Sequence, residues 1–248
     1  MTQSDYASGM NLLRSKSLLA AVALVSLATG AGAENDSAGS TSGLSTVQIV
    51  EQMESHEQTR NEALKHYTTL RRYEVEYKGL GAVEARMTVE VNYDIATGKN
   101  LEIVSSSGSK FLIEKVLKRA VESEREAFRD RSSTALTPAN YRFELVGTET
   151  VGGRPAYVLH VEPVTPSKFL YRGKVWVDAT DFAVAKMETQ PAKSPSFWIS
   201  QTLIHYTGAK MDGFWMPQQM RSETSVRVGG AAVMTINYGN YEIASDLR

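Results

Sequence analysis

The sequence predicts an α+β protein built on one large, strongly curved antiparallel sheet, an unclosed β-barrel with two or three helices on its concave apolar face. Three observations predict this class. The hydrophobic period changes from helical to alternating near residue 70, about ten or eleven strand-length segments follow one another between turn residues, and both long helical segments lie in the first half of the chain. Consecutive hairpins pair neighbouring strands, so the helices are left to cover one face.

The first helix is predicted to begin after Ser45 and to run to about Tyr67. Ser45 and Gln48 form an S-x-x-Q capping box, which satisfies backbone N–H groups at a helix start. Val50 and Met53 lie on one side, whereas the centre of the segment is polar. This pattern is typical of a helix that lies on a surface.

The first two strands are predicted from complete alternation. Residues 83–94 place Val, Ala, Met, Val, Val and Tyr on one side and polar residues on the other. The preceding strand places Tyr73, Val75 and Tyr77 on one face, and the Gly79-Leu80-Gly81 turn joins the two strands as a hairpin.

A second helix is predicted after a third strand that ends at Gly108. Ser109 can cap it, and an apolar stripe that includes Leu112, Val116 and Leu117 runs along it to about Phe128. Only strands are expected beyond residue 140. They are residues 140–150, 155–164, 169–180, 183–190, 197–207, 213–220, 221–228 and 232–243.

The N-terminal 33 residues are predicted to be a secretory signal. Arg14 and Lys16 precede an apolar run at 18–27, and residues 31–33 (AGA) form a small-x-small cleavage site. The run is about 10 residues, whereas a membrane-spanning helix needs about 20. Met10 offers a second start that places the signal at the terminus. Residues 34–43 are expected to form a flexible leader and residues 44–246 a single domain in the periplasm.

The composition excludes several classes of protein. The chain has no cysteine, which removes disulfides, thiolate nucleophiles, thiolate metal sites and the lipobox of lipid-anchored proteins. The net charge is −1 and no basic face is evident, which argues against nucleic acid as a partner. The expectation is a soluble exported protein without a lipid anchor.

Motifs for catalysis or metal binding are weak. None of the four histidines belongs to a motif such as H-E-x-x-H. Ser107 and Lys110 form an S-x-x-K pattern, but the partner motifs S-D-N and K-T-G are missing, so a turn and helix cap is the simpler interpretation. We therefore expect no enzyme, no metal and no cofactor, and an envelope hydrolase is only a remote alternative.

The remaining indication of function is the number of large, adaptable apolar side chains. The chain has eleven Tyr, three Trp and nine Met. Any one of them suits an ordinary core, but a bent sheet covered by few helices leaves space that side chains need not fill, and such space binds apolar ligands. The candidate ligand-binding residues are Tyr73, Val75, Tyr77, Met87, Val89, Val91, Leu112, Val116, Leu117, Met187 and Trp198.

Residues 171–180 (YRGKVWVDAT) with 183–188 (AVAKME) are predicted to form a strand pair, and 212–217 (DGFWMP) a turn downstream of it. These segments resemble the corresponding strand pair and turn of the outer-membrane lipoprotein-sorting (LolA-like) superfamily, RseB-type sensors included. The opening helix at 49–53 and the segments around 60–61 and 70–73 also resemble the start of that domain. The 171–180 motif has a structural basis, since Asp178 can accept local N–H bonds in a hairpin turn.

The resemblance implies a half-barrel with a helical lid and an apolar cavity. It implies an exported carrier that binds lipid or lipoprotein acyl chains in the cell envelope, with an inner- or outer-membrane protein as a further partner. The alternative on the same fold is an envelope sensor or protein-interaction module that recognises a partner at an exposed sheet edge or helix. Burying an acyl chain contributes about 0.8 kcal/mol per CH₂, so carriage needs no catalytic residue.

Overall fold

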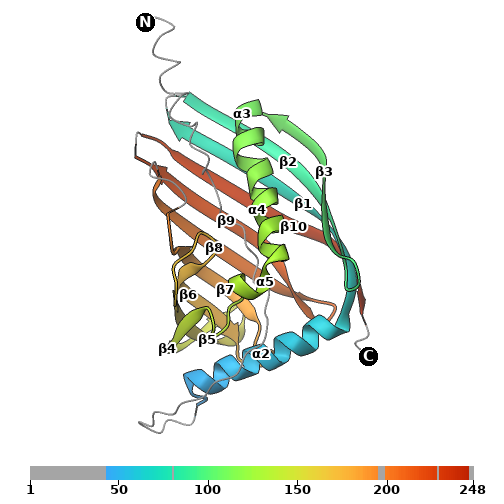
Figure 1. Cartoon of the computed structure of the whole chain (residues 1–248), viewed down its shortest axis with the longest axis vertical. Coiled ribbons are helices and arrows are strands. Elements are labelled where there is room, and N and C mark those ends of the chain that lie inside the picture. The colour runs from blue at the N-terminus through green and yellow to red at the C-terminus, as the bar shows by residue number, and fades with distance from the viewer. Residues whose placement is uncertain (1–42, 80, 195–198, 228, 246–248) are drawn as a thin grey trace, which may run out of the picture.

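The computed structural model describes residues 43–79, 81–194, 199–227 and 229–245, and Figure 1 shows their arrangement. The predicted signal (1–33) lies outside these residues, as does the leader except for its last residue. The helices are α2 (Thr46–Ala63), α3 (Lys110–Leu112), the π-helical turn η2 (Ile113–Leu117), α4 (Lys118–Arg129) and α5 (Arg131–Thr134). The strands are β1 (Leu64–Gly79), β2 (Gly81–Asp94), β3 (Gly98–Gly108), β4 (Tyr141–Val151), β5 (Arg154–Pro163), β6 (Tyr171–Asp178), β7 (Val184–Pro191), β8 (Ile199–Met211), β9 (Phe214–Val226) and β10 (Ala231–Ser245).

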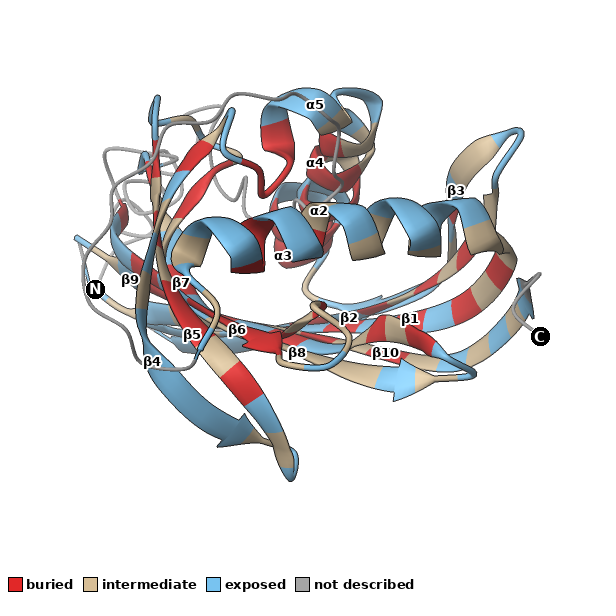
Figure 2. Ribbon diagram, turned by 90° about the horizontal axis from the view of Figure 1, so that it is seen from below, coloured by how far each residue is buried: buried red, intermediate tan, exposed pale blue. Residues whose placement is uncertain are grey.

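The ten strands form one antiparallel sheet in the order β3-β2-β1-β10-β9-β8-β7-β6-β5-β4. The first strand therefore lies inside the sheet, where it pairs with both β2 and β10. Strands β3 and β4 are the two edges, so the curved sheet does not close into a barrel (Figure 2). The predicted fold class is confirmed.

The helices lie on the concave side of the sheet (Figures 1 and 2). Elements α3, η2 and α4 are contiguous, and we call residues 110–129 the cover helix. It crosses the sheet over β1, β2 and β10, whereas α2 crosses the open end of the curve beside β4 to β7. No helix in the described part of the chain is long and apolar enough to cross a membrane.

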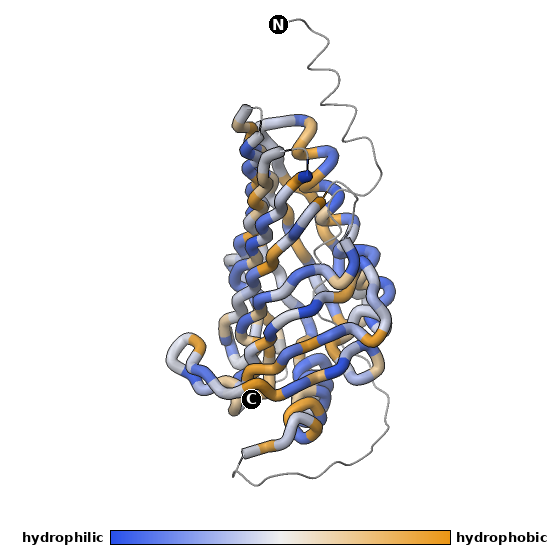
Figure 3. The backbone as a smooth tube through the Cα atoms, turned by 90° about the vertical axis from the view of Figure 1, so that its left-hand side faces the viewer, coloured by the Kyte–Doolittle hydropathy of each residue, from blue (hydrophilic) through white to orange (hydrophobic). Residues whose placement is uncertain are grey.

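The alternating pattern that predicted β2 is also its burial pattern. Ala85, Met87, Val89 and Val91 are buried, whereas Val83, near the hairpin end, is exposed. Figure 3 shows the same alternation of hydrophobic and hydrophilic residues along the strands. The predicted capping box of Ser45 and Gln48 at α2 is present, with both of its hydrogen bonds.

Two predicted boundaries were wrong. Helix α2 ends at Ala63 rather than near Tyr67, because the chain from Leu64 onward pairs in the sheet, where Tyr67 lies opposite both Tyr93 and Ile243. Residues 213–220 and 221–228 were predicted as two strands but form the single strand β9. Its ladder with β10 continues without a break through residues 220 and 221, so no turn separates them.

The concave face carries two apolar clusters. The cover-helix cluster joins that helix to β1, β2, β3, β9 and β10, with one residue each from β6 and β8. It consists of Tyr67, Tyr73, Val75, Ala85, Met87, Val89, Val91, Leu101, Leu112, Ile113, Val116, Leu117, Ala120, Val121, Ala127, Tyr171, Ile204, Phe214, Met216, Met220, Met234, Ile236 and Tyr238. The α2 cluster joins α2 to β4, β5 and β6. It consists of Ile49, Val50, Met53, Leu136, Tyr141, Leu159, Val161, Leu170, Val175, Val177 and Ala192.

Candidate functional site

Most of the predicted ligand-binding residues meet beneath the cover helix. The sheet contributes five of them and the helix three, and all eight are buried in the cover-helix cluster. They are Tyr73, Val75, Met87, Val89, Val91, Leu112, Val116 and Leu117. The helix packs directly on the sheet here, so these residues fill the space between the two elements. Their role in ligand binding stays a prediction.

The other three predicted residues lie apart from that group. Tyr77 is partly buried at the margin of the cover-helix cluster, and its hydroxyl donates a hydrogen bond to the Gly229 carbonyl at 3.1 Å. Met187 packs against the α2 cluster and lines a pocket. Trp198 lies outside the described residues.

A buried ion group, which the sequence reading did not identify, joins the cover helix to the sheet. Arg71 on β1 donates from Nη1 to both carboxylate oxygens of Glu124 on α4, each at 2.8 Å. Lys99 on β3 donates to the same carboxylate. The side chains of Arg71, Glu124 and Lys99 are only 1%, 2% and 7% exposed, so this ion group is almost fully shielded from water.

A periodicity signal could have found both charged partners. Arg71 shares the odd-numbered face of β1 with Tyr73 and Val75, which point into the core. Glu124 lies seven residues after Leu117 and three after Val121, so it continues the apolar stripe of the helix. A charged residue on each of two facing apolar surfaces indicates a buried pair.

The ion group changes the acidity of its members. Burial alone would raise the pKa of Glu124, but the Arg71 and Lys99 cations lower this pKa to about 2. Burial would lower the pKa of Arg71, and the Glu124 carboxylate instead holds it well above the ordinary value. Arg71 and Glu124 therefore remain charged at neutral pH.

Tyrosines surround the ion group. The Arg71 guanidinium lies over the ring of Tyr238, 4.7 Å from its centroid, which is a cation–π contact. Tyr67 stacks on Tyr93 and also contacts Tyr241, with centroid distances of 5.2 and 6.0 Å. Within the described residues, the buried Nε of Arg71 and the buried hydroxyl of Tyr238 have no hydrogen-bond partner. The site therefore holds donors that the protein itself does not use.

A pocket of about 120 Å³ lies between α2 and strands β7 to β9. Its walls come from α2, from the segment after α5 and from the β6–β7 turn, together with the three strands. They are Met53, Glu57, Arg60, Leu136, Phe182, Ala183, Val184, Met187, Tyr206, Trp215 and Pro217. Several wall residues belong to or pack against the α2 cluster, and Tyr241, which packs against the cover-helix cluster, donates to the Pro217 carbonyl at 3.0 Å. The pocket therefore lies where the two clusters meet.

The polar members of the pocket come chiefly from α2. Arg60 and Glu57 form an ion pair with a 2.5 Å contact, and both side chains are about one-fifth exposed. Burial, and then the nearby Glu57 carboxylate, raise the pKa of Tyr206, so its hydroxyl stays protonated at neutral pH. The pocket thus combines apolar walls with one charged pair.

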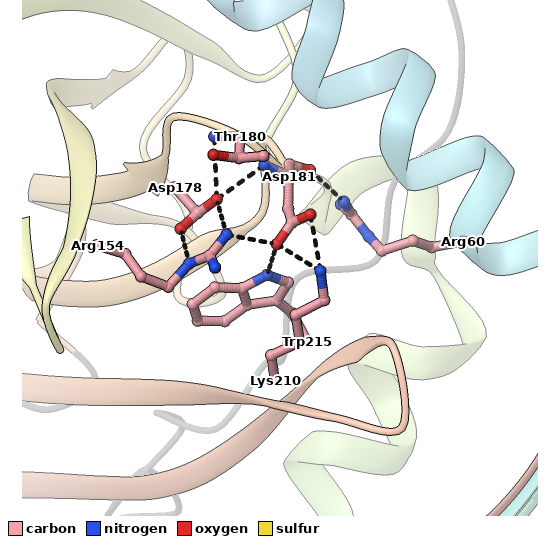
Figure 4. Close-up of polar contacts among 7 residues, drawn as sticks. All are labelled: Arg60, Arg154, Asp178, Thr180, Asp181, Lys210 and Trp215. Carbon is pink, nitrogen blue, oxygen red and sulfur yellow. Dashed lines mark hydrogen bonds and ion pairs between the residues drawn. The ribbon is translucent and has the colours of Figure 1, made fainter.

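A polar cluster fixes one side of this pocket (Figure 4). The Asp178 carboxylate accepts from the N–H groups of Thr180 and Asp181, at 3.0 and 2.8 Å, as predicted for a hairpin turn. Arg154 on β5 binds both oxygens of Asp178, at 2.5 and 2.9 Å. Burial would raise the pKa of Asp178, but these hydrogen bonds hold this pKa below the usual value.

Asp181 connects three further elements to that turn. Its carboxylate accepts from Arg154, from Lys210 on β8 and from the Trp215 indole on β9, each at 2.9 Å. Its backbone carbonyl accepts from Arg60 of α2 at 2.9 Å. The two sequence motifs at 171–180 and 212–217 therefore meet at one place, and Arg60 and Trp215 belong both to this cluster and to the pocket wall (Figure 4).

The described residues contain no group of three or more His, Asp or Glu placed to hold a metal ion. The polar cluster consists of paired charges and turn hydrogen bonds, which is a structural arrangement. What this geometry can do chemically is to hold an apolar group in the pocket and a charged group beside Arg71.

Comparisons with known proteins give a family and several similar folds. A family model described as "-like: Uncharacterized protein" matches residues 119–247, slightly more than half of the chain. Among curated proteins, none matches. Solved structures that are similar include a DUF1329 family protein from Desulfovibrio piger, with 13% identity, a TM-score of 0.40, and coverage of 82% of this chain and 95% of that one.

Two other similar structures are named after the superfamily that segments of this sequence resemble. An outer membrane lipoprotein-sorting protein domain from Vibrio parahaemolyticus has 15% identity and a TM-score of 0.41, with 80% of this chain and 93% of that chain covered. A LolA superfamily protein from Nitrosomonas europaea has 13% identity and a TM-score of 0.38, with 83% and 96% covered.

Proposed function

The chain belongs to the family described as "-like: Uncharacterized protein", a description that assigns no activity, and we propose from its geometry that it binds and carries an apolar acyl chain in the cell envelope. The single observation that carries the proposal is the pocket at the junction of the two apolar clusters. Its walls include Met53, Met187, Phe182 and Trp215, which are large side chains that adapt to irregular ligands.

The pocket volume sets what this conformation can hold. An apolar cavity of about 150 Å³ accepts a benzene ring, so about 120 Å³ suits the end of a chain or one ring-sized group. Pockets that enclose a whole small-molecule ligand are larger, at about 300–1,000 Å³. A long acyl chain therefore needs further space, and the interface between the cover helix and the sheet is where that space can open.

The cover helix is built so that it can separate from the sheet. Its interface consists of apolar side chains, one ion group and a hydrogen bond from Arg125 to the Leu101 carbonyl at 2.6 Å. It also contains the π-helical turn η2, a feature that is frequent at functional sites. Burial of a 12-carbon chain there would contribute about 10 kcal/mol to the binding free energy, at about 0.8 kcal/mol per CH₂. The costs of opening the helix and immobilising the ligand are subtracted from this value.

A protein-interaction module on the same fold is the second candidate, and the open sheet edges favour it. Strand β3 is an edge, and its last residues, including Val104, are exposed. An extended segment of a partner could add to such an edge by backbone hydrogen bonds.

The test of carriage is whether lipid accompanies the protein. The full chain is produced in a bacterial host, recovered from the periplasm and examined by native mass spectrometry and organic extraction. We expect a co-purifying acyl species that is released on denaturation. A clean apo mass, with no response to added fluorescent fatty acid, would leave the interaction module as the better account.

A matched pair of variants locates the binding. Ala183→Leu adds a side chain into the pocket wall and is expected to weaken binding of the fluorescent fatty acid about tenfold, since lost packing of one or two methylenes has that effect. Ala82→Leu makes the same change at an exposed position of β2 and should leave the affinity unchanged. Equal affinities for the two variants would exclude this pocket.

A further inference from the structure

The ion group beneath the cover helix carries unequal charge. Arg71 from β1 and Lys99 from β3 supply two positive charges, and Glu124 from α4 supplies one negative charge. The other groups that face Arg71 are tyrosines, Tyr67 and Tyr73 from β1 and Tyr238 and Tyr241 from β10. Burial raises the pKa of Tyr73, Tyr238 and Tyr241, so these three hydroxyls are neutral. The buried group therefore has an excess of one positive charge, which is unfavourable in a region shielded from water.

The donors of the group also exceed its acceptors. Within the described residues, Arg71 uses Nη1 for both oxygens of Glu124 and leaves its Nε unpaired, although the side chain is only 1% exposed. The buried hydroxyls of Tyr73 and Tyr238 are also unpaired in this part of the chain, and the Tyr238 ring lies against the guanidinium. Three unpaired groups that can donate, beside excess positive charge, are the features of a site for an anion.

We propose that Arg71 and Lys99 bind the anionic head group of the acyl ligand, and that the Glu124 carboxylate occupies the place of this head group when the cover helix is closed. This inference rests on the proposed function. When a ligand enters and the cover helix moves, Glu124 leaves with it, and both cations remain on an apolar sheet face. A carboxylate or phosphate on the ligand replaces the lost charge, whereas a neutral head group leaves both cations unpaired.

The position of the two cations fits this exchange. Arg71 lies opposite Tyr238 of β10, and β9 separates β10 from β8, which carries the pocket residue Tyr206. Across the sheet, the pocket residues Trp215 and Pro217 on β9 are therefore two strand spacings from Arg71, about 10 Å, and Tyr206 on β8 is three, about 14 Å. Tyr241 of β10 connects the two regions, because its hydroxyl donates to the carbonyl of the pocket residue Pro217 at 3.0 Å and its ring contacts Tyr67 of β1. An acyl chain that spans this distance can place its end in the pocket and its head group at the cations.

The test compares ligands that differ only in the head group. The full chain, freed of lipid by organic extraction and refolded, is titrated with dodecanoate, dodecyl phosphate and dodecanol at pH 7.5 by calorimetry, below their critical micelle concentrations. We expect at least one anionic ligand to bind about 10- to 100-fold more tightly than dodecanol, the range that a hydrogen bond to a charged group gives. Tighter binding of dodecanoate indicates a fatty-acid site, and tighter binding of dodecyl phosphate indicates a site for a phospholipid-type head group.

Variants assign that preference to the two cations. Lys99→Met keeps the Arg71–Glu124 pair intact and should reduce the preference for the anion about tenfold. Glu124→Gln weakens the closed state that every ligand displaces, so it should raise the affinity for all three ligands and leave the preference unchanged. Lys118→Met removes an exposed charge of the same helix and should change nothing. If all three ligands bind equally, or if Lys99→Met keeps the full preference for the anionic ligand, this inference is wrong. The proposed binding of an acyl chain would then still hold. If none of the ligands binds, the proposed function itself fails.

Discussion

The two halves of the concave face are held in different ways. Beneath the cover helix, a densely packed apolar cluster surrounds ions that are almost fully buried, including Arg71 and Glu124. Beneath α2, the apolar cluster borders a pocket. Of the charges beside it, Asp181 and Arg60 are partly exposed, whereas Asp178 is buried and paired with Arg154, which is 41% exposed. The energetic consequences differ, because a buried charge that loses its partner costs much more than an exposed one.

This difference suggests a division of roles. The α2 half is fixed by hydrogen bonds between turns and strands, so it can keep a preformed pocket. The cover-helix half is held by one ion group, by apolar contact and by the Arg125–Leu101 hydrogen bond. A ligand with a charged head and an apolar chain could replace the first two. The predictions below test this contrast, beginning with the largest expected effect.

Loss of Glu124 should produce the largest change in stability. Glu124→Ala leaves Arg71 and Lys99 buried without a partner and should lower the free energy of unfolding by about 3–5 kcal/mol in urea titrations. Glu122→Ala removes an exposed partner of Arg125 on the same helix and should cost less than about 1 kcal/mol. Similar costs for the two variants would contradict the contrast between the halves.

Acid should weaken the cover-helix half. The pKa of Glu124 is about 2 in the folded protein, below its ordinary value of 4.5, so its contribution is present above pH 4.5 and is lost as the pH falls toward 2. The shift corresponds to about 3 kcal/mol of the free energy of unfolding. The difference in this free energy between wild type and Glu124→Gln should shrink over that pH range. A difference that stays constant with pH would be evidence against a charged, buried Glu124.

A glycine fixes the start of the cover helix. Gly108 has a φ of +93°, and an added Cβ would lie 2.5 Å from the Glu84 carbonyl oxygen, which accepts the N–H of Ser109. Gly108→Ala should therefore lower the free energy of unfolding by about 2 kcal/mol. Gly81→Ala, at a φ of +141° in open space, isolates the cost of the backbone conformation alone and should cost less. If Gly81→Ala costs as much, the contact with Glu84 is unimportant.

The smallest effect is expected in the polar cluster of the α2 half. Trp215→Phe removes the indole N–H that donates to Asp181, while Asp181 keeps its ion pairs with Arg154 and Lys210. The free energy of unfolding, measured by thermal unfolding, should therefore fall by about 1 kcal/mol. Trp176→Phe removes a comparable bond to the exposed Glu149, but it also truncates a side chain that is only 3% exposed, so it should cost more. A loss of several kcal/mol at Trp215 would mean that this cluster is as critical as the buried ion group.

The sequence was sufficient for the fold because its signals are local. Alternation in β2 and the capping box at Ser45 each follow from a few neighbouring residues, and the structure contains both. The end of α2 was predicted too late because the sheet pairing of Leu64 and Tyr67 with residues near 244 is a long-range effect. The single strand β9 was divided because its pairing with β10, rather than any local residue, makes it continuous.

The candidate site was predicted only in part. Periodicity correctly gathered Tyr73, Val75 and Leu117 on facing surfaces, but it cannot tell whether a space between them is filled. The structure fills that space and places the pocket beside Met187 instead. Arg71 and Glu124 are not among the residues predicted from the sequence, although their spacing places them on the apolar faces of β1 and the cover helix.

Movement of the cover helix on ligand binding is the central claim, and the absence of cysteine allows a direct measurement. Spin labels on Lys118→Cys in the cover helix and Arg221→Cys in β9 report their separation by double electron–electron resonance. We expect added dodecanoate to shift the distance distribution to longer values and the ligand-free protein to give one short, narrow distribution. A distribution that is unchanged when calorimetry shows the ligand bound would contradict the account.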